Sequence, residues 1–141
     1  MQLSEHFSLE ELTATQVRGA DNSLPPSLLD AMRDTAVRME SVRSALGRPI
    51  IVTSGYRSAL VNKIVGGVPN SAHMSARAVD FICPAFGSPR DVCSAIQRSG
   101  IKFDQLIWEY GWVHISFDLQ MRGQVLTKHS ASAPFVEGLA A

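Results

Sequence analysis

The sequence predicts a single α+β domain, in which helices pack on one face of a mainly antiparallel sheet. One observation is the order of helical and strand-like segments, which favours this class over a doubly wound parallel sheet. A second is the short link at residues 109–111, which joins two strand-like segments as a hairpin would. A third is the length of 141 residues with 45% hydrophobic residues, which suffices for one core without disulfides or metal.

Four helices are predicted: one beginning at Ser8, and three over residues 27–46, 58–65 and 88–98. Ser8 and Glu11 have the spacing of a capping box, in which each side chain binds the backbone of the other residue. The second helix has apolar residues at three- and four-residue steps and ends before Gly47, so it should lie along the core. The last helix has Ser88 as its N-cap and Pro89 in its first turn.

Strands are predicted over residues 50–53, 78–83, 103–108 and 112–117, with a weaker edge strand at 124–127. Successive side chains of a strand point to opposite faces, so Phe81 and Ile115 are expected in the core. Asp80 and His114 then point the other way. We therefore expect Asp80 and His114 on the same exposed face of the sheet.

The remaining segment, residues 129–141, is predicted to be a loose tail that follows a domain over residues 1–128. Cys83 and Cys93 do not have the spacing of a zinc ribbon. We expect two small buried hydrophobic residues, although a disulfide between them stays open at this stage.

The charge balance excludes some classes of partner. Thirteen basic and thirteen acidic residues cancel, so no general attraction for nucleic acid or anionic lipid is expected. No apolar run reaches the length of a membrane span, and residues 1–12 lack the features of a secretion signal. We expect a monomer that is cytoplasmic as synthesised and has neither a nucleic acid nor a membrane as partner.

Residues of the types that bind zinc occur in the stretch 54–80 and once more in a later strand. His73 and Asp80 stand seven positions apart, and His114 follows in the strand over residues 112–117. Two imidazoles and a carboxylate are a suitable donor set for a catalytic zinc, whose fourth position is open to water. A structural zinc site would normally be rich in cysteine, so this set favours catalysis.

Several motifs together carry a family resemblance: Ser54–Arg57 (SGYR), Asn62, Ser71–His73 (SAH), Asp80 and Trp112–Ser116 (WVHIS). In identity and order they resemble the M15 group of zinc D-alanyl-D-alanine carboxypeptidases and related cell-wall peptidases, which share the fold of the hedgehog signalling domain. Residues 6–11 and Asn22 extend the resemblance, which covers roughly residues 3 to 118.

The resemblance implies a zinc metallopeptidase that hydrolyses a peptide bond in the peptidoglycan stem peptide, with a water activated by Zn²⁺ as nucleophile. His73, Asp80 and His114 would be the metal ligands. Such an enzyme would be a D-Ala-D-Ala carboxypeptidase or an endopeptidase of the endolysin type. In the second case it would be a phage-encoded protein that acts on the wall after release. The alternative is a non-catalytic phage structural or assembly component, or a zinc-stabilised binding domain of the same fold.

The position at which many family members have their general base holds no acidic residue in this sequence. Many family members have an acidic residue three positions before the last histidine ligand, where this sequence has Gly111. Glu109 lies five positions before His114, and hedgehog-like members have their glutamate at about that distance. We expect Glu109 to be the base, with Asp104 as the reserve.

Further site residues follow from the same resemblance. Arg57 would bind a substrate carboxylate or the oxygen that becomes anionic in the transition state. Ser71 and Ser116 would bind the substrate backbone, while Tyr56 and Trp112 would form walls of the cleft. Each has a simpler reading: a surface ion pair for Arg57, a turn for Ser71, and packing for Trp112.

Ala76 is a second departure, because the family motif usually has glycine between the first histidine and the aspartate. If that position requires a left-handed backbone, alanine costs roughly 1–2 kcal/mol.

Overall fold

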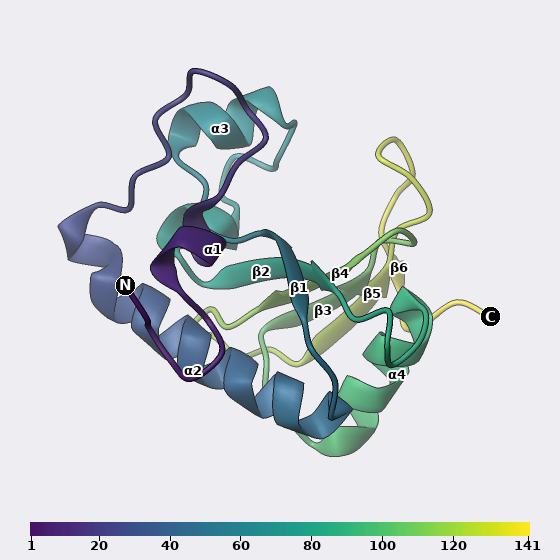
Figure 1. Ribbon diagram of the computed structural model, residues 1–141. Coiled ribbons are helices and arrows are strands. Elements are labelled where there is room, and N and C mark those ends of the chain that lie inside the picture. The colour runs from purple at the N-terminus through teal and green to yellow at the C-terminus, as the bar shows by residue number, and fades with distance from the viewer.

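The structure, a computed structural model that describes residues 1–141, is built on a six-stranded sheet with the strand order β1-β2-β4-β3-β5-β6 (Figure 1). The strands are β1 (Ile51–Ser54), β2 (Ala78–Ile82), β3 (Gln105–Trp108), β4 (Val113–Ser116), β5 (Gln124–Thr127) and β6 (Val136–Glu137). All neighbouring pairs are antiparallel except β3 and β5, which are parallel. The predicted α+β class with a mainly antiparallel sheet is confirmed.

The helices are α1 (Leu9–Thr13), α2 (Leu29–Leu46), α3 (Ala59–Ile64) and α4 (Pro89–Ser99), with 3₁₀ turns η1 (Pro26–Leu28) and η2 (Ala72–Ser75). Local signals account for their ends. The capping box of Ser8 and Glu11 is present at α1, and a second one joins Ser88 and Asp91 at α4. α2 ends at Gly47, whose left-handed φ of 65° suits a residue without a Cβ.

α2 and α4 pack against one face of the sheet (Figure 1). Met32 and Met39 of α2 are fully buried, as are Phe81 of β2 and Ile115 of β4. Burial of such a side chain stabilises the fold by roughly 1.5–3 kcal/mol. The predicted alternation of the strands is therefore confirmed on the core face.

The end of the chain differs from the expected loose tail. Residues Val136–Glu137 form β6 and pair with β5, so β5 is an internal strand and β6 is the edge. The hydroxyl of Thr127 donates to the Gly138 carbonyl at 2.7 Å, and the Arg90 guanidinium donates to the Ala140 carbonyl at 2.7 Å. These hydrogen bonds hold residues 129–141 against the domain, and neither could be foreseen from the sequence of the segment.

Cys83 and Cys93 are free, buried thiols, as the reading of two small hydrophobic residues predicted. Burial raises the pKa of Cys93 to about 12. None of the helices combines the length and the apolar character needed to cross a bilayer.

Candidate metal centre

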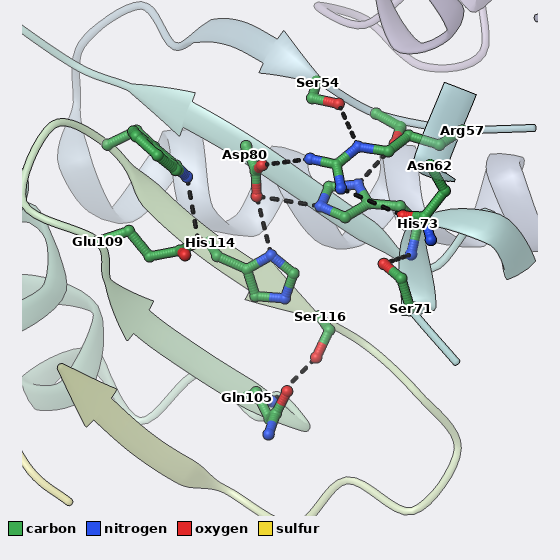
Figure 2. A network of polar contacts seen from close by, with 12 residues as sticks. Ser54, Arg57, Asn62, Ser71, His73, Asp80, Gln105, Glu109, His114 and Ser116 are labelled. Carbon is green, nitrogen blue, oxygen red and sulfur yellow. Dashed lines mark hydrogen bonds and ion pairs between the residues drawn. The ribbon is translucent and has the colours of Figure 1, made fainter. Parts of the chain in front are cut away.

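Three predicted metal ligands meet at one point of the sheet. Asp80 of β2 and His114 of β4 are direct partners across the antiparallel pair, so their side chains share a face. His73 reaches the same point from η2. Its Nε2 lies 3.1 Å from Asp80 Oδ1, and Nδ1 of His114 lies 2.8 Å from the same oxygen (Figure 2). The ligand atoms of the three residues all lie within 4.8 Å of one another.

This face of the sheet is not exposed, contrary to our expectation. Asp80 is only 5% exposed and His73 only 2%. The reason is that the chain between β1 and β2 folds back with α3 and η2, so that Arg57 and His73 lie over Asp80. A buried carboxylate requires partners for its oxygens, and the neighbouring side chains supply them.

The orientation of His73 is set by two backbone contacts. The amide of His73 donates to Ser71 Oγ at 3.2 Å, and its ring Nδ1 donates to the Gly55 carbonyl at 2.7 Å. Gly55 is required at that position, because a Cβ there would meet the Leu12 carbonyl oxygen at 2.3 Å. Since Nδ1 carries the proton in this hydrogen bond, Nε2 presents a lone pair toward Asp80.

The charges of the group fit a bound cation. Burial lowers the pKa of His73, which keeps its ring neutral. The carboxylate of Asp80 is ionised, because the Arg57 guanidinium donates a hydrogen bond to its Oδ2 at 3.0 Å. A lone pair of His73 and an ionised oxygen of Asp80 therefore face each other at 3.1 Å. Two acceptors at this distance need a proton or a metal ion between them, and nitrogen and carboxylate donors of this kind suit zinc.

Arg57 is bound within the site and is not a surface residue. Its Nη2 donates to Asp80 Oδ2 at 3.0 Å, its Nε to Ser54 Oγ at 3.0 Å, and its Nη1 to Asn62 Oδ1 at 3.4 Å. Asp80 thus uses one oxygen for the histidines and the other for Arg57 (Figure 2). A guanidinium has five N–H donors, so two remain free for a substrate.

A cleft of about 760 Å³ opens over this group. Its lining includes the following predicted site residues: His73, Asp80, His114, Arg57, Ser71, Glu109 and Trp112. The volume lies within the range of sites that enclose small ligands or a few residues of a peptide.

The family model for Peptidase M15 matches residues 5–116. This chain belongs to the peptidase M15 family. The family consists of zinc peptidases, which agrees with the donor set of His73, Asp80 and His114. No curated protein sequence matches the chain.

Two carboxylates of this M15 peptidase were candidates for the base, and their surroundings differ. Oε2 of Glu109 accepts a hydrogen bond from Trp112 Nε1 at 3.1 Å, and the side chain faces the cleft. Burial raises the pKa of Glu109, and the negative charge of Asp80 raises it further. Asp104, by contrast, accepts two hydrogen bonds from the Arg122 guanidinium, at 2.9 and 2.8 Å, and these lower its pKa. The geometry favours Glu109, because the oxygens of Asp104 are already occupied.

Two predicted substrate-binding residues of the peptidase do not reach the cleft. Ser116 is 1% exposed, and its Oγ accepts a hydrogen bond from the Gln105 amide at 3.1 Å. The ring of Tyr56 is buried in the core, where α1 packs against the end of β1. The sequence did not show what would cover these two side chains. The expectations that Ser116 binds the substrate and that Tyr56 forms a wall of the cleft are therefore wrong. Ser71 and Trp112 do line the cleft.

Several motif residues have supporting functions that the sequence did not specify. The side-chain amide of Asn22 donates to the carbonyls of Thr13 and Tyr56, and its oxygen accepts from the Ser58 amide. Asn62 similarly bridges Arg57 and the Val68 carbonyl. Both asparagines fix the loop that carries Arg57, and their place in the family motif was the only signal for them.

Ala76, which stands where the family motif usually has glycine, adopts a left-handed backbone conformation. It ends η2 at a φ of 61° and a ψ of 30°, and its methyl group is fully buried. The peptidase therefore carries the expected strain of roughly 1–2 kcal/mol three residues after His73, at the end of η2.

Proposed function

We propose that this M15 peptidase hydrolyses a peptide bond in the stem peptide of peptidoglycan, either as a D-Ala-D-Ala carboxypeptidase or as an endopeptidase of the endolysin type. The observation that carries the catalytic part is the convergence of His73 Nε2 and His114 Nδ1 on one oxygen of Asp80 within the cleft. The choice of a cell-wall substrate rests on the resemblance of the motifs.

His73, Asp80 and His114 would hold the zinc ion. When bound, zinc supplies a Lewis acid that polarises a carbonyl and lowers the pKa of water. The Gly55 carbonyl holds the ring of His73, and Arg57 holds the second oxygen of Asp80. These contacts orient the donor atoms before any ion arrives, which reduces the reorganisation needed on binding.

Glu109 takes the proton from the attacking water and returns it to the leaving amine. Its raised pKa, caused by burial and by Asp80, makes it a better proton acceptor than a solvated carboxylate. The hydrogen bond from Trp112 Nε1 holds one oxygen of Glu109 and leaves the other oxygen available. Arg57 has two free N–H groups and can donate to the oxygen on which negative charge develops.

The test combines zinc analysis with mass spectrometry of digested peptidoglycan. Protein purified from zinc-replete cells should contain about one zinc per chain, and it should release either terminal D-alanine or separated stem peptides. His73→Ala should lose both zinc and activity. His6→Ala is the matched control, because His6 binds Glu40 and does not line the cleft.

Zinc-free wild-type protein from such a preparation would contradict the metal site. Zinc-loaded protein that cleaves no wall peptide would instead favour a zinc-stabilised binding domain. Cleavage of other peptides alone would retain the peptidase and reject the proposed substrate.

A further inference from the structure

One wall of the cleft comes from a part of the chain beyond the family match at residues 5–116. His129 and Phe135 belong to the connection between β5 and β6, and both line the cleft. The connection starts at a defined place, since the Lys128 amide donates to the Trp108 carbonyl at 2.9 Å. The segment is therefore held next to the turn that follows β3.

The parallel pairing of β3 and β5 determines which residues meet there. Trp108 is the partner of Thr127, so the same register carried two residues further brings Tyr110 beside His129. The two rings are in contact, with centroids 4.6 Å apart and an angle of 44°. The other neighbour of Tyr110 is Trp108, whose ring is stacked at 4.1 Å and 6°. Trp108, Tyr110 and His129 thus form one aromatic stack.

Tyr110 lies in the turn that carries Glu109 and Trp112. Its φ of 60° is unusual for a residue with a side chain, and the Gly111 amide donates to the Glu109 carbonyl at 2.8 Å. A strained backbone of this kind persists only where surrounding contacts determine it. Tyr110 and Gly111 are exposed, so burial of the turn does not supply that constraint. Hydrogen bonds from the Glu109 amide to the Trp112 carbonyl and from Trp108 Nε1 to the Tyr110 carbonyl hold the backbone of the turn, and the aromatic stack holds the Tyr110 side chain.

We propose that His129 is a positioning residue of the active site, which holds the turn of Glu109–Trp112 through its contact with Tyr110. This inference rests on the proposed role of Glu109 as the base. His129 is not one of the three residues that converge as metal ligands. Its part is that of an aromatic ring, which a phenylalanine can also play.

The test uses His129→Ala and His129→Phe in the whole chain, with Phe86→Ala as a matched control. Phe86 is also an exposed aromatic residue, but it does not line the cleft. The chain has two tryptophans, Trp108 and Trp112, and both flank Tyr110. Tryptophan fluorescence therefore reports on this turn without any need for activity, and thermal unfolding shows that each variant is folded.

His129→Ala should shift the tryptophan emission to longer wavelength and increase its quenching by acrylamide, because the turn opens to solvent. It should lower kcat on peptidoglycan fragments by between about tenfold and about 100-fold, with KM and zinc content little changed. His129→Phe should restore both signals, and Phe86→Ala should change neither.

Unchanged fluorescence and kcat in His129→Ala would overturn the proposal. A kcat as low in His129→Phe as in His129→Ala, with wild-type fluorescence, would also overturn it and would indicate imidazole chemistry. If the wild type cleaves no wall peptide, the proposed function fails, but the fluorescence of the same variants still decides whether His129 holds the turn.

Discussion

Substitution of Gly55 by alanine should weaken zinc binding, although Gly55 is not one of the three metal ligands. The added Cβ would lie 2.3 Å from the Leu12 carbonyl oxygen, whereas ordinary contacts begin at 3.4 Å, so the two backbones must separate by about 1 Å. Neither side can rotate away, because the Leu12 carbonyl also accepts the Tyr56 amide at 2.7 Å. Overpacking lowers the unfolding free energy by about 1–3 kcal/mol. We expect the upper half of this range, because the atom that the new Cβ meets belongs to the backbone of Leu12 and not to a flexible side chain.

The same displacement acts on His73, since the Gly55 carbonyl accepts its Nδ1 hydrogen at 2.7 Å. Loss of a contact that orients a metal ligand typically lowers metal affinity by about 10- to 100-fold. Gly55→Ala should therefore bind zinc about 10- to 100-fold more weakly in competition with a chelator. Its unfolding midpoint should fall by roughly 6–12 °C.

Gly111→Ala is the control for stability and zinc affinity, because a Cβ at Gly111 meets no atom within 4 Å. A Gly55→Ala protein that unfolds and binds zinc like the wild type would refute the argument that close approach of α1 positions His73.

Three further substitutions test the carboxylates and the strained loop. Glu109→Gln should lower kcat by about 10²- to 10⁴-fold with zinc retained, and undiminished turnover would exclude it as the base. Asp104→Asn should instead cost about 1.5–3 kcal/mol of unfolding free energy near neutral pH. Arg122 lowers the pKa of Asp104, so the ionised carboxylate stabilises the wild type above pH ~4. The difference in unfolding free energy between the wild type and Asp104→Asn should therefore disappear as the pH falls below that value. A difference that does not depend on pH would contradict this. Ala76→Gly should change the unfolding free energy by less than about 1 kcal/mol, because relief of strain is offset by loss of a buried methyl group and a more flexible unfolded chain. A change of more than about 2 kcal/mol in the unfolding free energy, measured with urea, would contradict this balance between strain, the buried methyl group and the flexibility of the unfolded chain.

Features that depend on residues close together in the chain were predictable. Ser8 and Ser88 cap their helices as their spacing indicates, and Gly47 ends α2. The alternation of β2 and β4 put Asp80 and His114 on one face, and the structure makes them direct partners. These predictions succeeded because helix ends and strand parity are properties of a few neighbouring residues.

Other features of the site required packing between distant segments. Strand parity assigned Ser116 to the face of His114, but the Gln105 amide binds its hydroxyl and the side chain is buried. Tyr56 immediately precedes Arg57 in the sequence, yet its ring is buried in the core. An alternating pattern says which face a side chain takes, but it does not say what covers that face.

The sequence by itself determined the donor types, their order, and the strands that carry Asp80 and His114. Only the tertiary structure decided that Asp80 divides its oxygens between the histidines and Arg57, and that the segment after β5 returns to the cleft. The physical reason is range: capping and alternation act over a few residues, whereas these contacts join residues that are far apart in the chain and meet only when the sheet is assembled.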